Sequence, residues 1–112
     1  MAKEIILSVN SDPHSPKYLM WSLDEAECEA IRLAIGTDED YFPLLTTLSD
    51  YFEDFECVEG RLLALSQETI DLTIKLEEQH RDQPLLIKLL TLIGGLGALA
   101  HDSRLNVYGY AN

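Results

Sequence analysis

The chain has 112 residues and a mass of 12.6 kDa. At this size two domains would each have a marginal core, so we expect a single domain over residues 1–112. Hydrophobic residues make up 46% and charged residues 25% of the chain, which is ordinary for a globular protein and argues against disorder. The net charge is −12, from 20 acidic and 8 basic residues. Such a surface repels phosphate groups, which argues against nucleic-acid partners and anionic membranes.

The sequence also predicts a cytoplasmic protein. The apolar run Ile5 to Val9 is too short for a signal-peptide core. Cys28 and Cys57, the two cysteines, form no CxxC pair and have no histidine at metal-ligand spacing, so we expect reduced, partly buried thiols. The longest apolar stretch, Leu89 to Ala100, is shorter than the ~20 residues of a membrane span. No transmembrane segment is therefore predicted.

Two short strands are predicted at the start of the chain. Apolar residues alternate with more polar ones over residues 4–9, which is typical of a strand. Turn formers fill residues 10–16. A second short apolar run follows over residues 17–21 and is expected to pair with the first strand.

A helix is predicted over residues 23–35. Ser22 and Glu25 have the spacing of a capping box, in which each side chain bonds the backbone amide of the other residue. Gly36 lies where a left-handed C-terminal cap belongs. The apolar residues recur at helical spacing and would form the buried side: Leu23, Ala26, Ala30, Ile31, Ala34 and Ile35.

The middle of the chain is predicted to contain a helix and a further strand. Thr37 followed by three acidic residues is typical of a helix start. Pro43 occupies either the first turn of a helix that runs to about Phe55 or a turn that precedes that helix. The apolar run Arg61 to Leu65, behind Gly60, predicts a short strand.

Two more helices are predicted for the C-terminal part. Residues 67–81 alternate as a half-buried strand would, but Ser66 as a candidate N-cap and the helix-favouring end of this segment favour a helix. The next helix begins at residues 82–84 and is apolar nearly all round to residue 101, so we expect it to be buried. Its glycines predict the close approach of another backbone: Gly94, Gly95 and Gly97.

The last residues, Arg104 to Tyr110, predict a closing strand with two rings, Tyr108 and Tyr110, on one face. At a sheet edge these rings would form a patch for a second copy or another chain. The alternative, which we favour, is that they cover the flank of a neighbouring helix.

These elements predict an α+β fold, with about four helices packed on a small sheet of three to four short strands and residues 84–101 as the buried helix. Residues 17–22 and 61–66 each contain a basic residue, four apolar ones and a serine. A duplicated strand–helix–helix unit therefore stands as an alternative to chance resemblance.

The segment from Thr37 to Glu59 has an unusual composition. It contains eight carboxylates, five of the nine aromatic residues, and no lysine or arginine. Carboxylates there would steer a basic partner, and the rings would hold it. The alternative is that the rings face inward and the acids are only the solvated side. The candidate partner-binding residues are Asp38, Asp40, Tyr41, Asp50, Tyr51, Glu53, Asp54 and Glu56.

No motif indicates catalysis or a cofactor. The chain has no Walker loop and no GxGxxG, GxSxG or HExxH motif, and the acidic segment lacks the DxDxDG spacing of a calcium loop. His14, His80 and His101 lie in three different predicted segments. We therefore expect no enzyme activity, no bound metal and no cofactor.

The sequence favours an acidic interaction protein that binds a basic protein partner and neutralises or regulates it. The comparison with small immunity or antitoxin proteins is one of physical type, since no motif identifies a family. One alternative is a homo-oligomeric accessory or structural domain, such as a homodimer, whose acidity serves solubility. The other is an enzyme or metal binder with a site that only the fold assembles.

Overall fold

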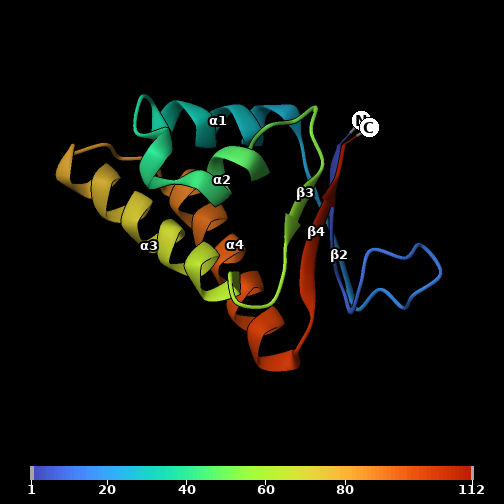
Figure 1. Ribbon diagram of the computed structural model, residues 1–112. Helices are drawn as coiled ribbons and strands as arrows, with labels where there is room; N and C mark the ends of the chain where they lie inside the picture. The colour runs from blue at the N-terminus through green and yellow to red at the C-terminus, as the bar shows by residue number, and fades with distance from the viewer. Residues whose placement is uncertain (1, 112) are drawn as a thin grey trace.

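Over residues 2–111, which the computed structural model describes, the protein has an α+β fold in which four α-helices pack on one face of a four-stranded antiparallel sheet (Figure 1). The strands are β1 (Lys3–Ser8), β2 (Leu19–Leu23), β3 (Phe55–Cys57) and β4 (Asn106–Tyr110). The helices are α1 (Glu25–Ile35), α2 (Pro43–Leu48), α3 (Leu62–Glu78) and α4 (Pro84–Ser103), and a short 3-10 helix precedes α2 at Glu39–Tyr41. The predicted fold class is confirmed.

The strand order is β2-β1-β4-β3. The predicted pairing of the first two strands is confirmed. Glu4 of β1 pairs with Tyr110 of β4, so the two ends of the chain lie side by side in the sheet (Figure 1). Because β4 lies between β1 and β3, the idea that the closing strand forms a sheet edge is wrong.

Helix α1 begins two residues later than predicted, because β2 continues almost to its cap. The capping box is formed by Asp24 and Glu27, not by Ser22 and Glu25. The amide of Glu27 donates to Asp24 Oδ1 at 2.7 Å, and the amide of Asp24 donates to Glu27 Oε1 at 3.0 Å. Gly36 follows the helix with a positive φ of 61°, as the glycine cap predicts.

Helix α2 is much shorter than the predicted helix to Phe55, which lies instead in β3. Buried charged side chains from other elements bond both of its ends. The Glu68 carboxylate accepts from the amides of Leu44 and Leu45, at 3.2 and 2.9 Å. The Lys3 ammonium donates to three backbone carbonyl oxygens at the other end, those of Thr47, Leu48 and Asp50. These bonds satisfy groups that a helix leaves free at its ends, and their charges match the helix dipole.

The predicted strand over residues 61–65 is wrong, because α3 begins at Leu62. Gly60, with a φ of 92°, precedes it. The helix predicted over residues 67–81 is confirmed, although Ser66 lies inside α3 and is not its N-cap. Residues 19–22 belong to β2 and residues 62–66 to α3, so the two similar sequence segments differ in structure.

Helix α4 crosses α3 closely at two of its three glycines. A Cβ at Gly94 would lie 2.5 Å from Thr69 Oγ1, and one at Gly97 would lie 2.9 Å from the carbonyl oxygen of Leu62. The predicted close approach is therefore confirmed at these two positions. It is wrong at Gly95, where a Cβ would have nothing within 4 Å.

Helix α4 is not buried all round as predicted, because Leu85, Leu92 and Leu99 are 83%, 52% and 50% exposed. With 20 residues and an 18-residue window of mean hydropathy 1.6, it also has the length and composition of a membrane span, unlike the shorter apolar stretch considered in the sequence. A core helix of a soluble protein passes the same test, and 33% of the apolar window is buried.

The two cysteines are buried and unbonded, as predicted. Burial raises the pKa of the Cys57 thiol to about 11 and also raises that of Cys28. Both thiols are therefore protonated and unreactive at neutral pH.

The buried Glu68 carboxyl predicts a pH dependence of stability. Burial raises the pKa of Glu68 above 4.5, and the amide hydrogen bonds from Leu45 and Leu44 only partly oppose this. Between the ordinary and the raised pKa the folded chain binds a proton at Glu68 that the unfolded chain has lost. Its contribution to stability is therefore fully present below the ordinary pKa and is lost as pH rises through the raised value.

The comparison that isolates this effect is with Glu68→Gln, which is neutral at every pH. We expect the wild type to lose unfolding free energy relative to this variant as pH rises from about 4 to 7. Urea unfolding of both proteins measures this difference. The two proteins share all their other carboxylates, so the contributions of those groups to the pH dependence cancel. A difference that moves the opposite way would mean that the two amide hydrogen bonds outweigh burial.

Candidate functional site

The face of the sheet away from the helices is covered by none of them (Figure 1). Ile5 and Leu7 of β1 belong to the core under the helices, so the alternating residue Glu4 points to the other face. The strand register places Tyr110 beside Glu4, and Glu56 of β3 beside Tyr108. We call this group, with the neighbouring Asp54, the acidic sheet face; its residues are Glu4, Asp54, Glu56, Tyr108 and Tyr110.

The two tyrosines stack on each other. Their ring centroids are 6.5 Å apart, and the ring planes differ by 13°. Tyr108 is 4% exposed, and its hydroxyl oxygen accepts from Asn106 Nδ2 at 3.3 Å, whereas Tyr110 is half-buried. Because both rings lie on the sheet face that no helix covers, the preferred interpretation that they cover a helix flank is wrong.

Carboxylates surround these rings. Glu4, Asp54 and Glu56 are exposed. Asp54 Oδ1 accepts from the amide of Ala111 at 2.9 Å, which joins the start of β3 to the end of β4. Burial raises the pKa of Tyr110, and the neighbouring Tyr108, Asp54 and Glu56 raise it further. In the strands, the residues of this face include no lysine or arginine, so its field is negative.

The loop Asp50–Asp54 between α2 and β3 extends this acidic surface. Lys3 Nζ bonds the carbonyl oxygen of Asp50 at 2.9 Å, which fixes the start of the loop. Tyr51 packs against the core. Phe52 contacts Tyr51 edge to face, at a centroid distance of 5.3 Å, and is 71% exposed. The loop thus presents one apolar ring and the exposed Glu53 to solvent.

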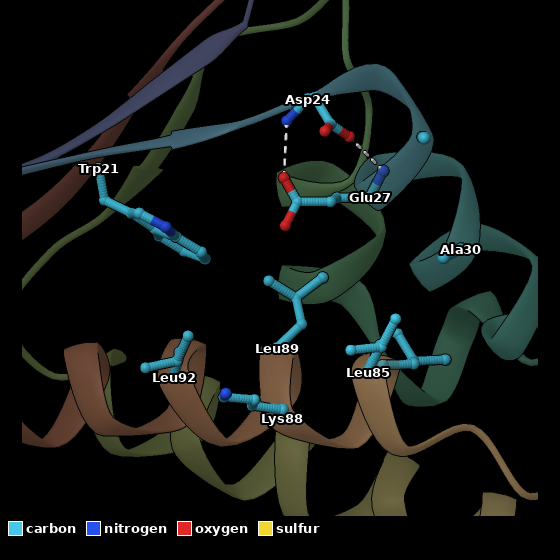
Figure 2. Close-up of a pocket in the computed structure, with 10 residues that line it drawn as sticks. Trp21, Asp24, Glu27, Ala30, Leu85, Lys88, Leu89 and Leu92 are labelled. Atoms are coloured by element: carbon cyan, nitrogen blue, oxygen red, sulfur yellow. Dashed lines mark hydrogen bonds between the residues drawn. The ribbon is translucent and has the colours of Figure 1, made fainter.

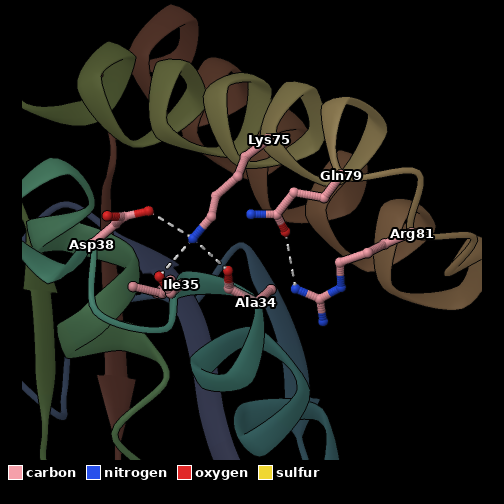
Figure 3. Close-up of polar contacts among 6 residues, drawn as sticks. All are labelled: Ala34, Ile35, Asp38, Lys75, Gln79 and Arg81. Carbon is pink, nitrogen blue, oxygen red and sulfur yellow. Dashed lines mark hydrogen bonds and ion pairs between the residues drawn. The ribbon is translucent and has the colours of Figure 1, made fainter.

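Three of the predicted partner-binding residues lie elsewhere, in the connection between α1 and α2. Asp38, Asp40 and Tyr41 belong to this connection, and Asp38 and Tyr41 line a small hollow with Lys75 of α3. Lys75 Nζ pairs with Asp38 Oδ2 at 2.8 Å and also donates to the carbonyl oxygens of Ala34 and Ile35 at the end of α1 (Figure 3). The ion pair partly neutralises the acidity of this corner.

The structure thus divides the predicted set of residues in two. Asp50, Tyr51, Glu53, Asp54 and Glu56 lie in β3 and the loop before it, and the remaining three lie in the connection between α1 and α2. The aromatic rings also divide: Phe42 and Phe55 are buried at 4% and 3% exposure, whereas Tyr41 is 77% exposed, like Phe52.

Sequence reasoning did not assign Glu4 and Tyr110 to this site. The alternation within each strand already places Glu4 opposite the apolar side of β1, and Tyr108 and Tyr110 together on one side of β4. What the sequence does not show is the pairing of the first strand with the last, because these residues lie at opposite ends of the chain.

A separate apolar groove lies between α4, β2 and the start of α1 (Figure 2). Its volume is about 470 Å³, and Trp21, Leu85 and Leu92 are among its lining residues. The acidic residues at its upper wall, Asp24 and Glu27, are engaged in the capping box of α1. Within residues 2–111, no group of three or more metal-binding side chains is close enough to hold a metal ion.

Comparison of the chain with protein-family models, with curated proteins and with solved structures found no match.

Proposed function

We propose that this protein binds a basic protein partner through the acidic sheet face and the adjoining loop Asp50–Asp54, and thereby neutralises or regulates that partner. The observation that carries this proposal is the composition of the face: three exposed carboxylates, those of Glu4, Asp54 and Glu56, around two stacked tyrosines, with no basic residue at its strand positions. Carboxylates attract and orient a cationic surface, and tyrosine rings accept lysine or arginine side chains on their faces.

The exposed charges and the rings have different roles in this proposal. Exposed carboxylates act mainly on the association rate and its salt dependence, because solvent screens them in the complex. Rings that become covered lower the dissociation rate. Tyr110, half-buried, and Phe52, 71% exposed, offer this contact area. The protein would act without catalysis, in the cytoplasm, by masking the basic surface of its partner.

A matched pair of triple variants tests this function. Glu4→Gln, Glu53→Gln and Glu56→Gln together remove three charges from the proposed interface. Glu29→Gln, Glu77→Gln and Glu78→Gln remove three charges from exposed positions of α1 and α3. After the partner is captured at low ionic strength and identified by mass spectrometry, we expect the first variant to lower the association rate on the order of tenfold and the second to change it little.

Two further variants sharpen the result. Tyr110→Ala is expected to raise the dissociation rate more than it lowers the association rate. Glu39→Gln with Asp40→Asn removes charge from the connection between α1 and α2. If this double variant slows association while the sheet variant does not, the partner binds at that corner instead. Equal slowing by both triple variants would show attraction to net charge alone, and capture of no basic protein would exclude the proposal.

A further inference from the structure

The outer side of α4 carries a row of leucines that the rest of the described chain leaves exposed. Leu85, Leu92 and Leu99 are 83%, 52% and 50% exposed. They recur every seven residues, which is close to two turns, so they form one row along the helix. Figure 2 shows Leu85 and Leu92 pointing from α4 toward the groove beside α1. A continuous apolar row of this kind marks an interaction surface.

A second row, next to the leucines, contains Lys88, Gly95 and Asp102, which are all exposed. Lys88 lies seven residues before Gly95, and Asp102 lies seven residues after it. Within residues 2–111, the side chains of Lys88 and Asp102 have no ion-pair or hydrogen-bond partner. A Cβ at Gly95 would meet nothing within 4 Å, so another backbone can come close at this point.

We propose that α4 is the interface of a homodimer, in which α4 of a second copy packs antiparallel about a two-fold axis at Gly95. Symmetry about this residue places Lys88 opposite Asp102 of the second copy and Leu92 beside its Leu99, and each contact occurs twice. The surface of α4 is thus complementary to itself in both charge and apolar character.

The charge distribution favours a second copy as the occupant. The chain has a net charge of −12, but between Asp82 and Asp102 its one charged residue is Lys88. Two acidic molecules can therefore meet along α4 with little repulsion. A basic protein would find no carboxylate along this stretch, and an anionic lipid surface would repel the rest of the chain.

Helix α3 would enlarge the same contact. Ile70 and Ile74 are 53% and 46% exposed and line a groove together with Thr91 and Ala98 of α4. This interface uses the helical layer, whereas the acidic sheet face belongs to the face of the sheet that no helix covers. The dimer is therefore independent of the proposed function.

Exchange of the two charges tests the dimer by sedimentation equilibrium. Lys88→Glu and Asp102→Lys each create two repulsive pairs, and we expect each to raise the dimer dissociation constant about tenfold. The double variant carries the pairs reversed and is expected to dimerise like the wild type. An equimolar mixture of the two single variants is expected to form a heterodimer, because both of its charge pairs then join a positive side chain to a negative one.

The matched control is Lys17→Glu, which makes the same change in net charge at an exposed position of the β1–β2 loop. We expect it to leave the dissociation constant nearly unchanged. Leu92→Ala and Leu99→Ala are expected to weaken the dimer, and urea unfolding at low concentration shows whether they fold normally. The proposal is wrong if the wild type stays monomeric at its highest soluble concentration, if Lys17→Glu acts as strongly as Lys88→Glu, or if the monomer instead binds uncharged phosphatidylcholine vesicles.

Discussion

Replacement of Gly97 by alanine is expected to lower the free energy of unfolding by about 1–3 kcal/mol, although alanine is the better helix former. A Cβ at this position would lie 2.8 Å from Ser66 Oγ and 2.9 Å from the carbonyl oxygen of Leu62. The serine hydroxyl already donates to the carbonyl oxygen of Gly94 at 2.7 Å. The Leu62 oxygen belongs to the backbone of α3, so the two helices must move apart. The strain of this overpacking exceeds the gain in helix propensity, which is about 1 kcal/mol.

Gly95→Ala is the control, because it lies two residues away in the same helix and a Cβ there meets nothing within 4 Å. We expect this variant to raise the free energy of unfolding by about 0.5–1 kcal/mol, since it restricts the unfolded chain without a clash. Urea unfolding of both variants at low protein concentration avoids a contribution from association through α4. Stabilisation by Gly97→Ala as well would show that α3 does not approach α4 as closely as the structure has it.

The sequence predicted the long helices well, since their patterns extend over several turns. In the sequence of α3, apolar residues alternate with polar ones as they would in a strand. Leu72 and Leu76 of this set are buried, whereas Ile70 and Ile74 are apolar residues that remain about half exposed. Both the apolar alternation and the helical row of buried leucines are therefore real features of one helix. The helix-favouring end of the segment pointed to the right choice between them, whereas Ser66, the other argument for a helix, lies inside α3 and does not cap it.

The short elements were harder to predict because contacts distant in sequence determine them. The short apolar run Leu62 to Leu65 fits either a strand or the first turns of a helix, and only packing distinguishes them. Helix α2 is short, and its ends are bonded by Lys3 and Glu68, which come from distant parts of the chain. Neither bond leaves a local sequence signal.

The candidate site was predicted only in part for the same reason. Composition drew attention to the acidic and aromatic segment as one unit, but α2 separates its first acidic group from its second. The pairing of β1 with β4 then adds Glu4 and Tyr110 to the second group. A site assembled from both ends of a chain by strand pairing is not visible in the composition of any one segment.

Replacement of Lys3 by methionine is expected to lower the free energy of unfolding by about 2–4 kcal/mol. Lys3 is 0% exposed, and its ammonium donates to the carbonyl oxygens of Leu48 and Asp50 at 2.9 Å each and of Thr47 at 3.3 Å. Burial lowers the pKa of Lys3, so methionine recovers the cost of desolvating the charge. It also removes three hydrogen bonds at the negative end of α2 and leaves the buried carbonyl oxygen of Leu48 without a donor, and this loss is the larger one.

The loss should also reach the candidate site, because Asp50 begins the loop that carries Phe52 and Glu53. We expect hydrogen exchange of the amides in residues 50–54 to speed up in Lys3→Met, while exchange in α4 follows only the change in global stability. Lys17→Met, at an exposed position, is expected to change the unfolding free energy by no more than about 0.5 kcal/mol and to leave the loop unchanged. If the two variants are equally stable and exchange alike, packing alone holds α2 and its loop, and the buried ammonium does not position the proposed binding surface.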